Sequence, residues 1–373
     1  MKLLALIAAA AAGVIVSAAP VYTIIDMGTM GGSQTTGAAI NQFGQVTGYG
    51  VDAQGNLHAF TSGSGAGDIT PAWANGGAAG YGINASGQVA GVSYVNGKAV
   101  ATSWNNGTAQ ALGGLGGSDS YAMAINSSGQ IAGMASTSNG QGHAVIYSNG
   151  QVQDVSPAGT SWSSAYGINS SGSVAGYAMN STGGFNAFVY SAATGSTILT
   201  SLGGSSYAFA INNGGQVAGA SISSTGYSHA VVWSGSGVTD LGTLGGGASF
   251  AYGINDSGSV VGYSMLAGNN SNHAFVYIGG AMFDLNLLVS NLGGWQLTNA
   301  YAINESGQIV GTGTLNGVEH AFVLTPQTAP LAAEAALPVH ANPEPGTVAL
   351  FITGLAALFS GRYLRNRLAS RVD

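Results

Sequence analysis

Histidine is the residue whose type and spacing in this sequence most readily suggest chemistry. Five of the six histidines begin a His-Ala-Phe or His-Ala-Val motif, namely His58, His143, His229, His273 and His320. Imidazole is a base and a common metal ligand near neutral pH. Histidines that recur once per repeat lie in different parts of the molecule, so they do not come together at one site. We therefore expect each ring to hydrogen-bond to backbone between neighbouring repeats, and two repeats replace the histidine by Val100 and Asn186.

Aspartate recurs in the same way and is the second candidate for chemistry. One carboxylate per repeat lies about 15 to 20 residues before a repeated Asn, at Asp26, Asp68, Asp154, Asp240 and Asp284. A calcium ion in each repeat, bound by this carboxylate and by loop carbonyls, is one interpretation. Calcium usually gathers several carboxylates, so we favour an Asp that holds the glycine-rich turn after it.

Charged residues that break the repeat are the third candidates, because an active site must depart from a repeated pattern. They are Asp52, Lys98, Asp119, Glu305 and Glu319. Paired carboxylates hydrolyse glycosides, and Glu305 and Glu319 fall in one repeat. Glu305 nevertheless occupies a variable turn position, so we interpret it as a solvated turn residue.

The remaining sequence predicts no reaction. It contains no nucleophile elbow, phosphate-binding loop or metal-ligand cluster, and the absence of cysteine excludes disulfides and thiolate chemistry. We predict no catalytic residue, no metal ligand and no cofactor. Trp162 and Trp295 lie near predicted loops and are candidates for stacking on a ligand, whereas Trp104 and Trp233 share one strand position and are expected in the core.

These residues are carried by seven repeats of about 43 residues. An Ile-Asn pair recurs with spacings of 43, 42, 43, 43, 43 and 49 residues, and each Asn is followed by a Gly three and seven residues later. The repeated Asn residues are Asn41, Asn84, Asn126, Asn169, Asn212, Asn255 and Asn304. In Asn-x-x-Gly the amide side chain bonds to its own backbone and Gly adopts a positive φ, so the motif predicts a hairpin turn.

Each repeat contains four short strands by alternation of apolar and polar residues. In the sixth repeat they are "SFAYGIN", "SVVGYS", "HAFVY" and a fourth strand, for which "GVTDLGTLGG" of the preceding repeat is the example. Four strands in about 43 residues are typical of one propeller blade. The seventh repeat lacks its fourth strand, and the segment "VYTIIDMGTMGG" from residue 21 resembles one. We therefore predict an all-β, seven-bladed β-propeller over residues 21 to 325 whose N-terminal strand completes the last blade; an open β-solenoid is the alternative.

Composition agrees with a folded chain of short strands and turns. Glycine contributes 63 of 373 residues, charged residues are 5% and apolar residues are 46%, whereas disordered chains have low hydrophobicity and high charge. Lys98 is the one cation between Lys2 and the C-terminal arginines. Because nucleic-acid binding depends on Lys and Arg, we expect no nucleic-acid partner.

The N-terminal residues 1 to 18 have the features of a secretory signal peptide. A single Lys precedes an apolar stretch and the small residues "VSA", after which we predict cleavage at Ala18. An N-terminal membrane anchor is the alternative. Residues 326 to 342 are rich in Pro and Ala and are predicted to be a linker.

The C-terminal residues 343 to 373 combine three features in order: Pro343-Glu344-Pro345, a short apolar stretch, and the basic residues Arg362, Arg365, Arg367 and Arg371. This segment resembles the PEP-CTERM sorting signal of Gram-negative bacteria. The resemblance implies transient anchoring in the inner membrane, recognition and cleavage by an exosortase, and delivery to the cell surface or beyond. An ordinary C-terminal membrane anchor is the alternative.

The repeats themselves resemble the HAF repeats of extracellular bacterial proteins, through His-Ala-Phe at residues 58–60, 273–275 and 320–322. The resemblance implies an exported repeat protein and no established reaction. We expect a non-enzymatic cell-surface or extracellular-matrix protein with a structural or binding role. A carbohydrate-binding module, with extracellular polysaccharide as partner, and a polysaccharide-acting enzyme are the alternatives.

Overall fold

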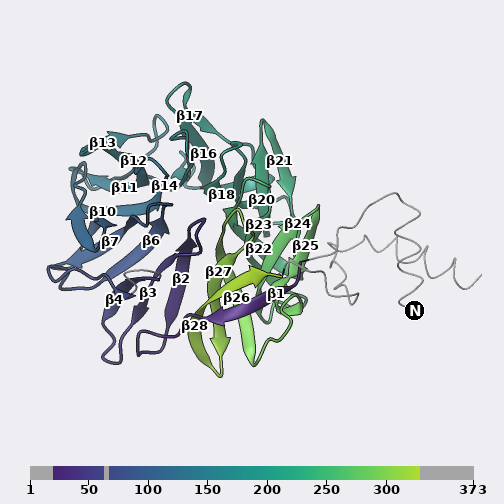
Figure 1. Ribbon diagram of the computed structural model, residues 1–373. Coiled ribbons are helices and arrows are strands. Elements are labelled where there is room, and N and C mark those ends of the chain that lie inside the picture. The colour runs from purple at the N-terminus through teal and green to yellow at the C-terminus, as the bar shows by residue number, and fades with distance from the viewer. Residues whose placement is uncertain (1–19, 63–66, 328–373) are drawn as a thin grey trace, which may run out of the picture. The chain divides into compact units, whose positions relative to one another are not determined.

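The computed structural model describes residues 20–62 and 67–327, and these form a seven-bladed β-propeller. Each blade is one four-stranded antiparallel sheet, and the seven sheets surround a central channel (Figure 1). Helix in the described residues is limited to one 3-10 turn, Leu285–Leu287. The signal peptide and the sorting segment predicted from the sequence lie outside the described residues.

Blades 1 to 7 are named by their innermost strands. In blades 1 to 6 the strands run from the channel outward in chain order, and in blade 7 the N-terminal strand is outermost. The innermost strands are β2 (Thr35–Ile40), β6 (Ala78–Ile83), β10 (Gly116–Ile125), β14 (Ser163–Ile168), β18 (Gly203–Ile211), β22 (Gly245–Ile254) and β26 (Trp295–Ile303). The second strands are β3 (Val46–Val51), β7 (Val89–Val95), β11 (Ile131–Thr137), β15 (Val174–Met179), β19 (Val217–Ser223), β23 (Val260–Leu266) and β27 (Ile309–Leu315).

The third strands begin with the His-Ala-Phe positions, and the fourth strands form the rim. The third strands are β4 (Leu57–Thr61), β8 (Lys98–Asn105), β12 (Gly142–Ser148), β16 (Phe185–Ser191), β20 (Ser228–Ser234), β24 (Asn272–Ile278) and β28 (Val318–Pro326). The fourth strands are β5 (Gly67–Asp68), β9 (Thr108–Ala111), β13 (Gln151–Asp154), β17 (Gly195–Ile198), β21 (Gly237–Asp240), β25 (Ala281–Asp284) and, in blade 7, β1 (Tyr22–Asp26).

The N-terminal strand closes the ring as the sequence predicts, which excludes the open solenoid. β1 pairs antiparallel with β28 over its whole length, from Tyr22 opposite Pro326 to Asp26 opposite Phe322. Tyr22 is 2% exposed, and its backbone N–H donates to Leu288 O at 2.8 Å. Gln327 N–H also donates to Val21 O, so the first two residues of the predicted linker belong to the ordered propeller.

The hydrophobic core is divided among the contacts between neighbouring blades. One such cluster joins Ala59 of β4 to Ala78 and Ile83 of β6 and to Trp104 of β8. The Ala of every His-Ala-Phe position is 0% exposed, because the next blade packs on it: Ala59, Ala101, Ala144, Ala187, Ala230, Ala274 and Ala321. A longer side chain there would force the blades apart, which explains why the motif keeps its Ala.

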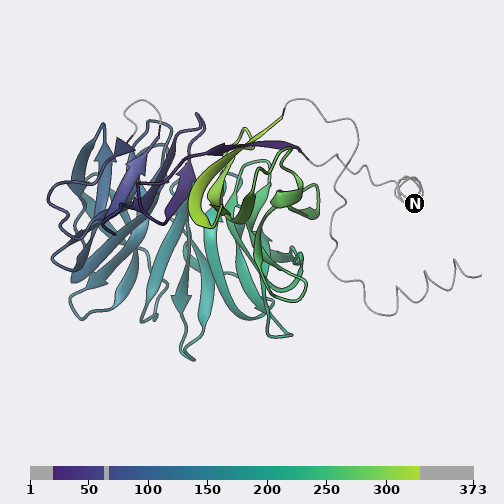
Figure 2. The ribbon, with the colours of Figure 1, turned by 90° about the horizontal axis from the view of Figure 1, so that it is seen from below.

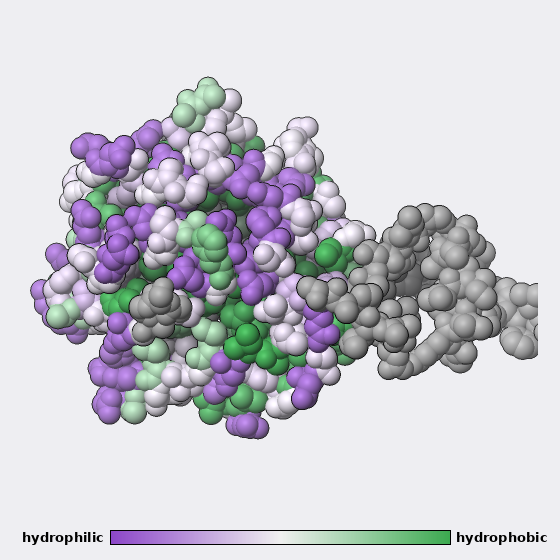
Figure 3. Space-filling model, viewed as in Figure 1, coloured by the Kyte–Doolittle hydropathy of each residue, from purple (hydrophilic) through white to green (hydrophobic). Residues whose placement is uncertain are grey.

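The alternating strand directions give the ring two different faces, seen edge-on in Figure 2. The turn face carries the hairpins between first and second strands, which contain the repeated Asn, and the hairpins between third and fourth strands. The connection face carries the loops between second and third strands and the links from each blade to the next. The face drawn in Figure 3 is a mosaic of hydrophilic and weakly hydrophobic residues with small hydrophobic areas.

The repeated Asn makes the predicted hairpin turn and also links each blade to the next. In blade 2, Asn84 Oδ1 accepts from the backbone N–H of Ser86 and of Gln88, both at 3.0 Å, and Gly87 has φ +78°. Asn84 Nδ2 donates to Gln88 Oε1 at 2.8 Å and to the backbone oxygen of Asn126 in blade 3 at 3.1 Å. Every repeated Asn donates in this way to the next, and Asn304 donates to Asn41 O at 3.0 Å, which completes a ring of seven hydrogen bonds.

Candidate functional site

The innermost strand of every blade contains a β-bulge three residues before the repeated Asn. In blade 1, Gly37 pairs with Gly48 and Ala39 pairs with Thr47, so Ala38 between them has no partner. The second repeated glycine is required at this place, because a Cβ on Gly48 would overlap the carbonyl oxygen of Thr36. A bulge redirects the unpaired side chain, and the glycine lets the two strands approach closely enough to form it.

The unpaired bulge residues line the central channel, and we call them the bulge ring. They are Ala38, Tyr81, Met123, Tyr166, Phe209, Tyr252 and Tyr301. All seven border a cavity of about 250 Å³ in the middle of the propeller. Burial raises the pKa of Tyr81, Tyr252 and Tyr301. These phenols therefore stay uncharged at neutral pH and offer the channel aromatic faces and hydroxyl donors rather than a nucleophile or a base.

Ten aromatic rings form a continuous cluster from the channel to the connection face, and we call this cluster the aromatic wall. Its members are Trp162, Tyr166, Tyr177, Phe185, Tyr207, Phe209, Phe250, Tyr252, Tyr263 and Tyr301. Neighbouring ring centroids are between 5.0 Å and 6.5 Å apart. Every one of these side chains is partly exposed to solvent. Such a partly exposed aromatic surface is a feature of ligand-binding sites.

The aromatic wall breaks the sevenfold symmetry of the ring. Blade 4 contributes four of its members, blade 6 three, blade 5 two and blade 7 one. At the position of Tyr177, by contrast, blade 2 has Val92 and blade 5 has Ala220, and at the position of Trp162, blade 2 has Gly77. Blades 1 and 2 carry a smaller pair of partly exposed rings, Tyr49 and Tyr81, with centroids 6.0 Å apart. The larger connected cluster in blades 4 to 7 is therefore the strongest candidate for a functional site.

The two predicted stacking residues have different outcomes. Trp162 lies in the aromatic wall, where its ring packs 5.5 Å from Tyr177 and 5.9 Å from Phe185, and it is partly exposed. Trp295 is wrong as a stacking residue, because it is 8% exposed and packs edge-on against His320 and Phe322 in the core. The core prediction for Trp104 and Trp233 is confirmed, since both are 2% exposed and donate through Nε1 to backbone oxygens of the preceding blade.

The repeated histidines bind the repeated aspartates, which corrects the expected bond to backbone between blades. His229 Nδ1 lies 2.8 Å from Asp240 Oδ2 in the same blade, and His143 Nδ1 lies 2.6 Å from Asp154 Oδ2. In blade 7 the partner of His320 is Asp26 of β1, at 2.9 Å. The same pair occurs in blades 1 and 6. The third and fourth strands of a blade are hydrogen-bonded neighbours, so a His on the third strand lies closer to the Asp on the fourth strand than to the backbone of another blade.

The aspartates hold the following turn as predicted from the sequence. Asp240 Oδ1 accepts from Gly242 N–H at 2.8 Å, and Asp154 Oδ1 accepts from Ser156 N–H at 2.9 Å. The sequence does contain a signal for the His–Asp pair, namely the joint replacement of both residues in two repeats. Blade 2 has Val100 with Ala111 at the two positions and blade 4 has Asn186 with Ile198, so both partners are replaced together.

Glu305 and Glu319 lie on opposite faces and do not form a catalytic pair. Glu305 follows the repeated Asn on the turn face, where its carboxylate accepts from Asp256 N–H at 3.0 Å. Asp256 in turn accepts from Asn213 N–H at 2.7 Å, so these side chains link neighbouring turns around the channel mouth. Glu319 begins β28 at the connection face, beside the hairpin to β27. Two carboxylates at opposite ends of the strands cannot flank one glycosidic bond.

The other repeat-breaking acids are also held by local hydrogen bonds. Asp52 accepts from Asn56 Nδ2 and from two backbone N–H groups, which lowers the pKa of its carboxyl to about 2. Asp119 accepts from the hydroxyl of Ser118 and from Ala99 N–H, and these bonds lower the pKa of its carboxyl. Within residues 20–62 and 67–327 no three His or acidic side chains are close enough to hold a metal ion.

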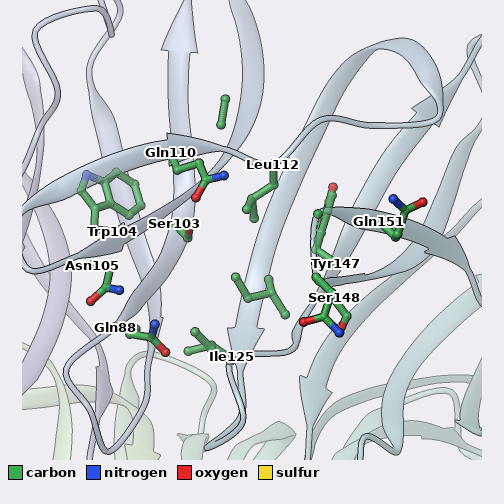
Figure 4. Close-up of a pocket in the computed structure, with 15 residues that line it drawn as sticks. Gln88, Ser103, Trp104, Asn105, Gln110, Leu112, Ile125, Tyr147, Ser148 and Gln151 are labelled. Atoms are coloured by element: carbon green, nitrogen blue, oxygen red, sulfur yellow. The ribbon is translucent and has the colours of Figure 1, made fainter.

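A second cavity, of about 260 Å³, lies between blades 2 and 3 (Figure 4). Gln88, Gln110 and Gln151 border it with their amides. Its aromatic residues belong to the core, since Trp104 is 2% and Tyr147 is 3% exposed. This cavity therefore lacks the free ring faces of the aromatic wall.

Comparisons with known proteins agree on the fold. No family model matches the sequence, and no curated protein sequence matches it. A puromycin hydrolase aligns with 83% of this chain and 55% of its own, at 13% identity and a TM-score of 0.52. A puromycin-hydrolyzing peptidase from Mycobacterium tuberculosis aligns with 84% of this chain and 55% of its own, at 11% identity and a TM-score of 0.52.

The propeller domain of the Trilobed protease from Pyrococcus furiosus is also similar, at 8% identity and a TM-score of 0.50 over 87% of this chain and 100% of that domain. This chain spans 64% of the length of TolB from Acinetobacter baumannii, another similar structure. At such identities the similarity shows a shared propeller fold, and it includes enzymes that contain propellers.

Proposed function

We propose that this chain is an exported cell-surface or extracellular-matrix protein whose propeller binds a ligand without transforming it. The signal peptide over residues 1 to 18 and the segment from Pro343 to Asp373 support export and sorting by an exosortase, with the inner membrane and the export machinery as transient partners. Both segments lie outside the described residues, and no helix within the described part of the chain is long and apolar enough to span a membrane.

The observation that carries the binding role is the aromatic wall. A repeat protein that only needed to close its ring could use the same residues in all blades, yet the largest connected group of partly exposed rings lies in blades 4 to 6 and extends to Tyr301 in blade 7. The neighbouring groups are hydroxyls and amides rather than an activated nucleophile, a base or a metal centre. This combination favours recognition over catalysis.

A polysaccharide-acting enzyme is the alternative function, and the propeller-containing hydrolases among the similar structures are the reason to test it. The two carboxylates that suggested it are on opposite faces. Glu319→Gln should therefore leave any activity toward polysaccharide unchanged. Loss of a measured cleavage activity in this variant would support the enzyme instead.

Export and sorting are tested in the source bacterium by cell fractionation and by mass spectrometry of the mature termini. We expect a mature N-terminus after Ala18 and a C-terminus near Pro343, with the protein in the surface or extracellular fraction. Replacement of Pro343, Glu344 and Pro345 by Ala should retain a longer form in the inner membrane. A protein that keeps its first 18 residues and stays in the cytoplasm would refute this proposal.

A further inference from the structure

We propose that the aromatic wall binds a neutral polysaccharide by stacking of its sugar rings. This inference rests on the binding role proposed above and names the ligand class and the residues. Six of the ten rings in the wall are tyrosines, so the surface combines flat apolar faces with hydroxyl groups. A pyranose ring has the same two properties, an apolar C–H face and hydroxyl groups around its edge. It therefore matches a surface of rings and hydroxyl groups better than a lipid chain does, because a lipid chain has no hydroxyl groups to pair with those of the tyrosines.

Polar groups that can bind sugar hydroxyls border the wall. Beside Phe185, Asn180 Nδ2 donates to Asn186 Oδ1 at 3.2 Å, and Ser205 Oγ accepts from Phe185 N–H at 3.1 Å. Asn180 Oδ1 already accepts from Thr182 N–H, Thr182 hydroxyl and Gly184 N–H, but its Nδ2 keeps a second N–H donor. Asn186 keeps the two N–H donors of Nδ2 and a second lone pair on Oδ1. Asn186 is the residue that replaces the repeated histidine in blade 4, so the loss of the His–Asp pair there provides an amide next to the wall.

The charge around the wall selects a neutral polymer over an acidic one. Lys98 is the one cation among residues 20–62 and 67–327, whereas acidic residues occur in most blades. Two of these acids occupy, in other blades, repeat positions that blade 4 fills with wall residues. Asp119 of blade 3 is equivalent to Trp162, and Glu319 of blade 7 is equivalent to Phe185. Burial of Tyr301 is accompanied by repulsion from Glu319, both of which raise the pKa of the phenol. A uronate or sulfated chain would approach Glu319 beside Tyr301, and blades 4 to 7 contain no Lys or Arg that could pair with it.

The wall is extended, which fits a polymer better than a single sugar. Trp162 and Phe185 lie toward the connection face, where β14 and β16 begin, while Tyr166, Phe209 and Tyr252 line the channel. The rings between them are in contact at centroid distances of 5.0 Å to 6.1 Å. Several sugar rings can therefore stack along one continuous surface from blade 4 to blade 6.

The test is affinity electrophoresis and calorimetry of the propeller as the purified exported protein, with hydroxyethyl cellulose, glucomannan and pullulan as neutral probes and alginate as the acidic probe. We expect binding to at least one neutral probe, little change between low and high salt, and no binding to alginate. Trp162→Ala and Tyr207→Ala should each weaken binding by about tenfold or more, as is usual for aromatic residues at the centre of a binding site.

Matched controls separate loss of the site from loss of the fold. Trp73→Ala removes another tryptophan on the connection face that is 41% exposed and outside the wall, and it should bind as the unmodified protein does. Trp162→Phe keeps a ring and should recover part of the affinity. All variants should melt within a few degrees of the unmodified protein, and a variant that does not is replaced by the Phe variant for the comparison.

Three results would overturn the inference: no binding to any neutral probe, equal binding by Trp162→Ala, or binding to alginate that falls with salt. The outcome can be separated from that of the proposed function. If the unmodified protein is exported and remains with the matrix while the wall variants do so equally, the ligand class is wrong and the exported role stands. If the protein is not exported but still binds a neutral probe through Trp162, the ligand class stands and the exported role is wrong.

Discussion

The ring of hydrogen bonds between repeated Asn residues should make an important contribution to stability, and Asn84→Asp tests it. Asn84 is 4% exposed, and its Nδ2 donates to Gln88 Oε1 and to Asn126 O in the next blade. The substitution keeps the acceptor oxygen for Ser86 and Gln88 N–H but replaces the donor by a second oxygen. At neutral pH a carboxylate then faces the carbonyl oxygen of Asn126 with no hydrogen between them.

The expected magnitude follows from the bonds that are lost. Two hydrogen bonds contribute about 0.5–1.5 kcal/mol each, and a buried group left without a partner costs about 1–3 kcal/mol more. We therefore expect Asn84→Asp to lower the free energy of unfolding by roughly 2–6 kcal/mol at pH 7. Its burial against a carbonyl should raise the pKa of the new carboxyl above its usual value of about 3.9.

The pH dependence distinguishes a lost donor from a general packing defect. Because the folded state would bind the proton more tightly than the unfolded state, the loss is smallest below about pH 4, where the protonated carboxyl can donate to Asn126 O, and it grows as pH rises. Urea unfolding followed by tryptophan fluorescence at pH 3.5 and pH 7 measures both quantities. Asn270→Asp, at an exposed loop position of blade 6, is the matched control. A loss below about 0.5 kcal/mol at pH 7, or a loss that does not vary with pH, would refute this account.

Three further predictions concern the closure of the ring, the His–Asp pairs and the contacts between blades. Deletion of residues 21 to 26 should abolish the cooperative thermal transition or lower its midpoint by more than 10 °C, since it removes a whole strand and buried Tyr22; an unchanged melting curve would contradict the closure. The hydrogen bond to Asp240 raises the pKa of His229, and, although burial opposes it, the bond from His229 lowers the pKa of Asp240. The contribution of the pair is present above about pH 4 and is lost as pH rises through the raised pKa of His229, so a double-mutant cycle of His229→Ala and Asp240→Ala should show coupling that is largest near pH 5 and, at this exposed site, below about 1 kcal/mol. A coupling energy that increases from pH 5 to pH 8 would contradict the assignment of a raised pKa to His229. Ala230→Leu should destabilise the protein by about 1–3 kcal/mol in urea unfolding, because Ala230 is 0% exposed between blades 5 and 6; Val318→Leu, at a site 38% exposed, should change little.

The sequence predicts the fold well because its signals are local and repeated. Asn-x-x-Gly specifies a turn by itself, and Gly44 and Gly87 indeed have a φ of +78°. The split of the fourth strand between the two ends of the propeller predicts closure by β1, and the pairing of Asp26 with Phe322 confirms it. Each of these inferences needs only the order of residues along one repeat.

Features that depend on neighbouring strands or blades could not be predicted in the same way. Nothing local to Asn84 shows that its Nδ2 reaches the carbonyl oxygen of Asn126 in the next blade. The bulge at Tyr166 follows from the pairing of Ala165 with Gly176 and of Gly167 with Ala175, and this offset decides which side chains face the channel. The sequence alone gives no means of distinguishing the aromatic residues of blades 4 to 6 from core residues, or exposed Trp162 from buried Trp295.

Because β1 closes the ring, the last blade to be completed contains contacts between residues that are far apart in the sequence. Asp26 and His320, for example, are 294 positions apart. Six blades can assemble from segments that follow one another directly along the chain, but the seventh has to wait until its final hairpin has been synthesised. The leading end of the propeller therefore remains without a sheet partner throughout translation. Such a delay would be compatible with the export proposed above, because the ring could close only after both of its ends had crossed the membrane.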